Sequence, residues 1–437
     1  MYRSVCSGFD AGGVRMHVLW YVNVVMPAAA AALGLPQVNI GGWLTGAAEA
    51  LQGSEIDFTI ATVTPLAKKW TTADVDGIRY ILLPQKHAQK LLPQMLTQEN
   101  PDLVHIFGTE YSYNTQLIHL CAHGGIHHVV SLQGIMYQCA HHYDDGLPER
   151  FRRINPAIWL MRKLYYADSI ALEKRRFAQQ GELEKRALQA AEAVIGRTAW
   201  DRQCALEINP NLRYYCVNEN LRAPFYTPEC WQYQNCVPHS IFVSQSFYPI
   251  KGFHMLLKAM PELIKRYQDI RIVVGGQKPY SLHNPILDMG VDYFFEYQRY
   301  IKKLIKEQGL SDYIHYTGSL TAEQMKQQYL RCNVFLSCAS IENSPNSVGE
   351  AMMLGTPIVA SDVGGTSSML KNGEDGILYD FFSTQEMIDG ISTMFDQPET
   401  AAQMGRNANH HAHQTHDRQK NTEALLKVYR DVTSKSV

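Results

Sequence analysis

The sequence has no marked excess of either charge. Its 437 residues include 40 lysines and arginines against 42 aspartates and glutamates, a formal net charge of −2. A chain without a global basic field can hold nucleic acid or an anionic membrane only through a local patch. We therefore expect no nucleic-acid partner.

Paired cysteines and long apolar runs are also lacking. Nine cysteines are an odd number, widely spaced and without a C-x-x-C motif, which favours a reduced, cytoplasmic protein. The stretch 17–35 comes nearest to a signal peptide or membrane span. Asn23 and Pro27 interrupt it, however, and its β-forming residues predict a buried first strand instead. Residues 1–15 are expected to form a loose leader.

The chain is longer than one hydrophobic core supports, since cores stop growing at roughly 250 to 300 residues. Apolar runs alternate with helical patterns in both halves, which predicts parallel sheets with right-handed crossovers and ligands at the carboxyl ends of the strands. We expect an N-terminal domain at 16–220, a proline-containing linker at 221–239 and a C-terminal domain at 240–416. The expected strands are 17–24, 58–63, 80–83, 103–107, 128–132, 193–196, 212–217, 241–244, 270–274, 314–317, 334–337 and 357–360.

The segment 336–376 contains the most informative pattern. Glu342 follows a predicted strand, Pro345 marks a turn, and Glu350 lies one turn into a helix with Asn346 or Ser347 as its expected N-cap. A helix N-terminus offers free N–H groups and about half a positive charge to a phosphate. A carboxylate such as Glu350 can accept hydrogen bonds from a ribose diol. The alternative is that both glutamates are ordinary solvated charges.

This segment resembles the retaining glycosyltransferases of family 4, which have the GT-B fold. The resemblance covers about 240–379 well, including Lys251-Gly252 and the sequence HYTGSL; the first half matches more loosely, through Gly41-Gly42 and PDLVHIFGTE. It implies an α/β protein with two tandem Rossmann-like doubly wound domains facing a cleft, and a C-terminal helix within 417–433 that crosses back to domain one. The matching residues are Glu342, Pro345, Asn346, Gly349, Glu350, Ala351, Met352, Gly355, Pro357, Val359 and Ala360.

The resemblance also implies an activity: transfer of a sugar from a nucleoside-diphosphate sugar to a glycan or lipid-linked acceptor in cell-surface polysaccharide synthesis. Configuration would be retained with no metal or other cofactor, and the departing phosphate would take the acceptor's proton. Catalytic roles are implied for Glu342, Lys251 and His105. Donor-binding roles are implied for Gly41, Gly42, Gln245, Ser246, Lys251, Gly318, Leu320, Asn343, Ser344, Pro345, Asn346, Ser347 and Glu350.

Three departures from the family pattern keep other functions open. Ser244, Gln245 and Ser246 stand where the family usually has an arginine, Phe107 where it often has a histidine, and Gln133-Gly134 where many members have His-Gly. The alternatives are a nucleotide-sugar epimerase of the same fold, which needs extra acid–base carboxylates, a phosphorylase, which needs a lysine for pyridoxal phosphate, and a catalytically silent nucleotide-sugar binder.

Three other patterns are interpreted as structural. Asp74-Val75-Asp76 matches the D-x-D of metal-dependent transferases but precedes Gly77, so we expect a surface turn. His410, His411, His413 and His416 with Asp417 are expected to form a polar connector rather than a metal site. The segment 150–186 has six more basic than acidic residues. It is interpreted as a solvated helix pair, with peripheral contact to the inner face of a membrane as the alternative.

Overall fold

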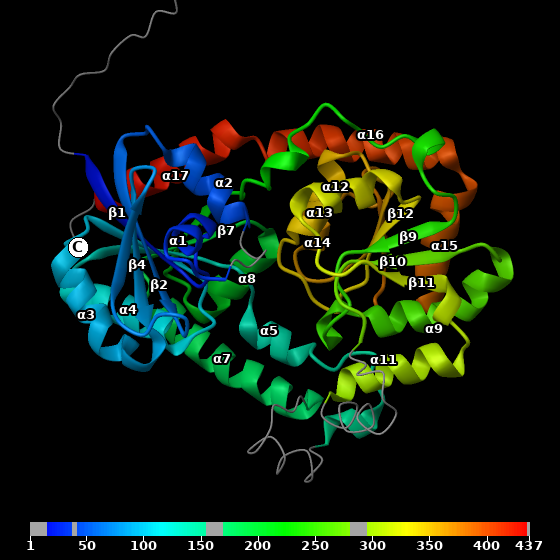
Figure 1. Ribbon diagram of the computed structural model, residues 1–437, viewed down its shortest axis with the longest axis horizontal. Coiled ribbons are helices and arrows are strands. Elements are labelled where there is room, and N and C mark those ends of the chain that lie inside the picture. The colour runs from blue at the N-terminus through cyan, green and yellow to red at the C-terminus, as the bar shows by residue number, and fades with distance from the viewer. Residues whose placement is uncertain (1–14, 37–41, 154–168, 280–294, 435–437) are drawn as a thin grey trace, which may run out of the picture.

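The structure is a computed structural model that describes residues 15–36, 42–153, 169–279 and 295–434. Two α/β halves lie side by side, each with a central sheet covered by helices (Figure 1). This confirms the predicted fold class. No helix among the described residues is both long and apolar enough to cross a bilayer. The eight cysteines in these ranges are all free.

The first half contains an eight-stranded sheet in the order β3-β4-β2-β1-β5-β6-β7-β8. Its central strand β1 is apolar and fully buried from Val18 to Val22, as expected of a parallel strand that is covered on both faces. The strands are β1 Met16–Val22, β2 Ile56–Thr64, β3 Thr71–Val75, β4 Ile78–Pro84, β5 Leu103–Phe107, β6 His127–Ser131, β7 Ala193–Gly196 and β8 Arg213–Cys216. The helices are α1 Pro27–Ala32, α2 Gly42–Leu51, α3 Ala88–Glu99, α4 Ser112–Gly124, α5 Met136–His141, α7 Ile170–Ala190 and α8 Ala199–Ile208, with 3-10 turns η1 Gln85–His87 and η2 Glu149–Arg152.

One edge of this sheet differs from the expected parallel arrangement. Strand β3 pairs antiparallel with β4. Asp76 and Gly77 form the hairpin turn with φ of 51° and 78°, and an Asp-Gly pair suits such a turn because both residues tolerate positive φ. Asp74 therefore lies in an edge strand rather than in a surface turn.

The second half contains a six-stranded parallel sheet in the order β11-β10-β9-β12-β13-β14. The strands are β9 Ser240–Val243, β10 Arg271–Val274, β11 Ile314–Tyr316, β12 Val334–Ser337, β13 Ile358–Ser361 and β14 Ile377–Tyr379. The helices are α9 Phe253–Arg266, α11 Glu296–Glu307, α12 Ala322–Arg331, α13 Asn346–Met353, α14 Thr366–Met369, α15 Thr384–Asp396 and α16 Pro398–Thr415, and the 3-10 turns before and within this half are η3 Ala223–Phe225, η4 Tyr233–Asn235, η5 Pro249–Lys251 and η6 Ser311–Tyr313. The prediction of a polar connector at His410–Asp417 was wrong in part, because His410, His411 and His413 belong to helix α16.

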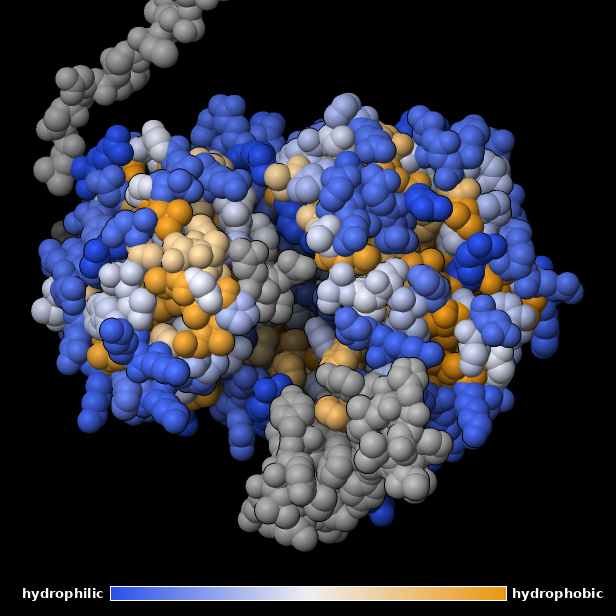
Figure 2. Space-filling view, viewed as in Figure 1, coloured by the Kyte–Doolittle hydropathy of each residue, from blue (hydrophilic) through white to orange (hydrophobic). Residues whose placement is uncertain are grey.

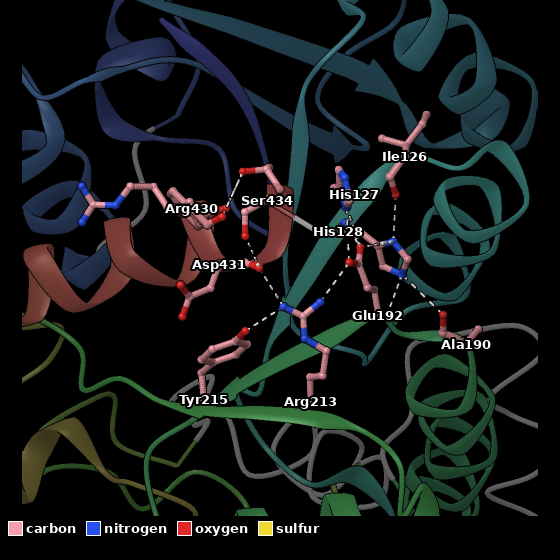
Figure 3. A network of polar contacts seen from close by, with 12 residues as sticks. Ile126, His127, His128, Ala190, Glu192, Arg213, Tyr215, Arg430, Asp431 and Ser434 are labelled. Carbon is pink, nitrogen blue, oxygen red and sulfur yellow. Dashed lines mark hydrogen bonds and ion pairs between the residues drawn. The ribbon is translucent and has the colours of Figure 1, made fainter. Parts of the chain in front are cut away.

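The last helix, α17 (Arg418–Thr433), crosses back to the first half, as predicted (Figure 1). The buried Tyr429 hydroxyl accepts a hydrogen bond from Trp20 Nε1 at 2.9 Å, so the helix is tied to the central strand β1. At the far edge, Arg213 of β8 donates to the Asp431 carbonyl at 3.0 Å and also pairs with Glu192 (Figure 3). These contacts anchor the C-terminal helix at two places on the first sheet.

A segment of the first half also packs into the core of the second. Tyr143, Leu147 and Phe151, which follow α5, belong to the apolar cluster formed by α9, α11 and the second sheet. Polar contacts accompany them, since Ser340 Oγ donates to the His142 carbonyl at 2.9 Å. The two halves are thus joined through the α5–η2 segment as well as through the linker and α17.

Candidate functional site

The candidate site is a cleft of about 860 Å³ between the two halves, where the molecular surface is hollowed (Figure 2). The second half contributes residues just beyond the carboxyl ends of three adjacent strands, β10, β9 and β12, which is where ligands bind open α/β sheets. Helix α2 and the linker form the facing wall. The predicted site residues that line the cleft are Gly42, Gln245, Lys251, Leu320, Glu342, Pro345, Asn346, Ser347 and Glu350.

Lys251 and Glu342 form an ion pair inside this cleft. The Lys251 Nζ lies 2.5 Å from Glu342 Oε1, although the two residues are 91 positions apart in the sequence. Burial lowers the pKa of Lys251, but the Glu342 carboxylate together with Tyr248 and Cys139 raises it by more, so the pKa of the ammonium is raised overall. Gly252 has φ of 65°, and a Cβ there would meet the Cys338 carbonyl oxygen at 1.7 Å. Only glycine at this position therefore lets Lys251 approach the end of β12.

The loop after Glu342 is held by backbone contacts that admit no side chain. Gly365 N donates to the Glu342 carbonyl at 2.9 Å, and a Cβ on Gly365 would lie 1.9 Å from the Asn343 carbonyl oxygen. Gly364 is similarly close to Glu342. The first half reaches the same loop, because Thr198 Oγ1 donates to Asn343 Oδ1 at 3.1 Å. The position of Glu342 thus depends on both halves of the molecule.

Helix α13 begins at the cleft wall. Its N-cap is Pro345, which makes no side-chain capping hydrogen bond. The predicted N-cap, Asn346 or Ser347, was wrong, because these two residues occupy the first helical positions. The first N–H groups of a helix have no intrahelical partner and carry about half a positive charge together. This end of α13 therefore suits an anionic group, and that it binds one stays a prediction.

Glu350, on the next turn of α13, is only 3% exposed and is already paired. Arg222 binds it through two hydrogen bonds, with Nε 2.6 Å from Oε1 and Nη2 2.7 Å from Oε2. Burial raises the pKa of the Glu350 carboxyl, and the hydrogen bonds and charge of Arg222 act in the opposite direction. Arg222 was not among the site residues predicted from the sequence. One sequence feature could have indicated a role for it: Arg222 is the single lysine or arginine of the predicted linker 221–239.

The structure does not bring every predicted residue to the cleft. His105 lies in a separate small cavity of the first half, 1% exposed, with its ring nitrogens 2.6 Å from the Tyr429 hydroxyl and 2.7 Å from Ser131 Oγ. Gly318 pairs with Gly276, which does line the cleft. Ser246, Asn343 and Ser344 lie next to lining residues without being among them, and Gly41 is outside the described residues.

The other polar patterns lie apart from this cleft. His411 Nδ1 is 2.7 Å from Asp375, and the buried His416 contacts the Glu219 carbonyl. Within the described ranges, no three histidine, cysteine, aspartate or glutamate side chains gather as a metal site would require. Of the basic segment, residues 154–168 are outside the described residues, and α7 packs against α4 and α5. Its membrane contact stays a prediction.

Comparison with known proteins finds a family model that matches part of this chain. Residues 238–411 match the family model "Glycosyl transferases group 1". Alpha-D-kanosaminyltransferase of Streptomyces kanamyceticus is 28% identical over 36% of this chain and 36% of its own length. The putative glycosyltransferase YtcC of Bacillus subtilis is 22% identical over 82% of this chain and 79% of its own length. The match to the kanosaminyltransferase therefore spans about a third of that relative.

Solved structures share the whole fold. Sucrose-phosphate synthase from Thermosynechococcus elongatus has a TM-score of 0.68 at 16% identity, covering 96% of this chain and 100% of that one. HepE of Anabaena, in a crystal structure with UDP-glucose, has a TM-score of 0.62 at 14% identity, covering 95% and 100%. At these identities the likeness establishes the two-domain GT-B fold.

Proposed function

We propose that this chain, which carries a glycosyl transferases group 1 domain at residues 238–411, moves a sugar from a nucleoside-diphosphate sugar to an acceptor. One observation carries the proposal: Lys251, Glu342 and the uncapped N-terminus of α13, which all belong to that domain, converge in one cleft. We propose a glycan or lipid-linked acceptor and a role in cell-surface polysaccharide synthesis, following the family resemblance.

The residues of the cleft suit the three parts of such a donor. The diphosphate would lie beside Lys251 and the first N–H groups of α13, which supply positive charge and hydrogen-bond donors. The hydroxyls of the sugar would donate to Glu342, and a ribose diol would donate to Glu350. The UDP-glucose bound to HepE, which has the same fold, supports a nucleotide-sugar ligand of this size.

In the proposed reaction, the bond between the anomeric carbon and the β-phosphate oxygen breaks. The acceptor oxygen bonds to the anomeric carbon from the same face, so configuration is retained, and the departing phosphate takes the acceptor's proton. Negative charge grows on that phosphate, where Lys251 and α13 stabilise it. Because these groups supply the charge stabilisation, we propose that no metal ion is required.

The test is to incubate the protein with EDTA and a panel of nucleotide sugars, and to measure release of the nucleoside diphosphate. We expect slow release from one donor, reduced at least about 100-fold in Glu342→Gln and Lys251→Gln, because each substitution removes a charge next to the breaking bond. The matched control is Lys265→Gln, which breaks a surface pair with Glu262. Lys265 is 74% exposed, so this change should leave release unaltered.

Other results would select other functions. Conversion of one nucleotide sugar into its epimer would indicate the epimerase, and tight donor binding with no release, even with an acceptor panel, would indicate the silent binder. Release that disappears with EDTA and returns with a divalent cation would overturn metal independence. Neither binding nor release across the panel would overturn the proposed function.

A further inference from the structure

Four charged side chains of the described residues line the cleft, and they form two closed pairs. Lys251 is bound to Glu342, and Arg222 is bound to Glu350. Both pairs line the same cavity. Two positive and two negative charges cancel, so these described side chains together offer no net charge with which to attract a diphosphate. A nucleoside-diphosphate sugar, however, brings both a diphosphate anion and many hydroxyl donors.

Arg222 is placed between the two halves. It comes from the linker, directly before η3, and its side chain crosses the start of α2: a Cβ on Gly42 would lie 3.0 Å from Arg222 Cδ. On its other side, the guanidinium lies 5.2 Å from the centre of the Phe225 ring. Its side chain is 24% exposed, whereas that of Glu350 is 4% exposed. Glu350 is therefore the more enclosed member of the pair, and Arg222 is the more exposed one.

The pairing leaves Arg222 able to bind an anion. A guanidinium has five N–H donors in a planar fork, and Glu350 engages Nε and Nη2. The same fork geometry matches phosphate oxygens as well as it matches a carboxylate. The Glu350 carboxylate can likewise accept hydrogen bonds from the two hydroxyls of a diol in place of those from the guanidinium. Both partners of the pair thus have an alternative partner on one donor molecule.

We propose that Arg222 is a donor-binding residue that exchanges Glu350 for the donor's diphosphate. This inference rests on the proposed function. On donor binding, the Glu350 carboxylate accepts hydroxyl hydrogen bonds and Arg222 turns to the phosphates, opposite Lys251. Arg222 then supplies the second cation of the site from the linker, whereas Ser244, Gln245 and Ser246 beside β9 carry no charge. Because Arg222 belongs to the connection between the halves, donor binding is coupled to their relative position.

The test compares the affinities for UDP, GDP and ADP with those for their nucleosides, by calorimetry and competition, on the full chain. The readout is the ratio of nucleoside Kd to diphosphate Kd, which reports phosphate contacts alone. We expect Arg222→Gln to lower this ratio about 10- to 100-fold, and Arg222→Lys to lower it less, because charge remains but the fork is lost. Arg430→Gln is the matched control: it breaks an arginine–glutamate pair with Glu55, in which both side chains are more than half exposed.

Glu350→Gln distinguishes exchange from a fixed scaffold. If Glu350 competes with the diphosphate for Arg222, this substitution weakens nucleoside binding but raises the ratio. In Arg222→Gln/Glu350→Gln, which leaves no buried unpaired charge, the ratio should equal that of Arg222→Gln. Circular dichroism and thermal unfolding confirm that each variant is folded.

Two sets of outcomes overturn the inference. The first set is equal losses of nucleoside and diphosphate affinity in Arg222→Gln, or a fall in the ratio of nucleoside Kd to diphosphate Kd in Glu350→Gln. Either result would mean that Arg222 only positions Glu350, and the proposed function would stand. Failure of the unaltered protein to bind any of the three diphosphates would overturn the proposed function and this inference together.

Discussion

Thr198 and Asn343 meet through one hydrogen bond that joins the two halves of the molecule at the candidate site. Thr198 Oγ1 donates to Asn343 Oδ1 at 3.1 Å and accepts from Asp201 N at 3.0 Å, so the same hydroxyl caps helix α8. Asn343 directly follows Glu342. A residue of the first half therefore helps to set the position of a proposed catalytic carboxylate in the second.

Thr198→Ala should therefore affect both stability and donor binding. Loss of the cap should lower the free energy of unfolding by about 1 kcal/mol, and loss of the bond to Asn343 should weaken donor binding about 3- to 10-fold. Thr198→Ser keeps the hydroxyl and should resemble the unaltered protein. Urea unfolding and calorimetry measure the two effects, and equal behaviour of the serine and alanine variants would contradict this role.

Gly365→Ala should damage the site by steric overlap. The backbone at Gly365, with φ of −91° and ψ of 5°, suits alanine, but its Cβ would lie 1.9 Å from the Asn343 carbonyl oxygen. The loop must then move, so we expect donor turnover to fall at least about 10-fold and stability by about 1–3 kcal/mol. In Gly124→Ala the nearest atom to the new Cβ is 3.6 Å away, so this control should be nearly neutral. An active, stable Gly365→Ala protein would contradict the close packing.

His105 should influence acid stability. Burial lowers the pKa of His105 to about 3, whereas an unfolded chain protonates it near 6.5. The stability it contributes is therefore complete above about pH 6.5 and is lost as the pH falls toward 3. When the pH is lowered from 7 to 4, the unfolding free energy of His105→Gln should fall by about 3 kcal/mol less than that of the unaltered protein, as measured by urea unfolding.

The same variant tests the catalytic role that the sequence predicted for His105. Because the ring lines a different cavity and is not among the cleft residues, we expect turnover of folded His105→Gln to stay within about 10-fold of the unaltered enzyme. A loss of more than about 100-fold with an unchanged pH dependence of stability would show that His105 acts on the substrate instead.

Glu184 should give the opposite pH dependence. Burial raises the pKa of this fully buried carboxyl to about 7, although Thr109 Oγ1 donates to it at 2.9 Å. Its contribution to stability is complete below about pH 4.5 and is lost as the pH rises through 7. A glutamine side chain cannot ionise. When the pH is raised from 5 to 8, the unfolding free energy of Glu184→Gln should therefore fall by about 2 kcal/mol less than that of the unaltered protein. Parallel stability curves would contradict the raised pKa.

Most strands of both sheets were predictable from sequence, because buried parallel strands are short continuous apolar runs. The runs 103–107, 193–196 and 334–337 match β5, β7 and β12 as predicted. The β3–β4 hairpin was missed because its edge strand is polar and only the Asp76-Gly77 turn marked it. Helix α16 was not predicted because its histidine-rich end was interpreted as a polar connector, although Pro398 at its first turn is a helix-start signal.

The candidate site was predictable only in part. Glu342, Glu350 and the start of α13 lie within nine residues of one another, so their spacing alone placed them on one loop and helix. The pairing of Glu350 with Arg222 was not predictable, because 128 positions separate the two residues. The same holds for His105 and Tyr429, which lie 324 positions apart.

By itself, the sequence determined the features that arise between neighbours in the chain: the apolar strands, the helix after Pro345, the glycines that follow β13 and the Glu342 carboxylate in the loop after β12. Only the tertiary structure decided which charged side chains are paired and which line the cleft, and that the His105 ring is enclosed in another cavity. The physical reason is that burial and ion pairing depend on contacts between distant segments, and no local spacing rule specifies the packing that brings such segments together.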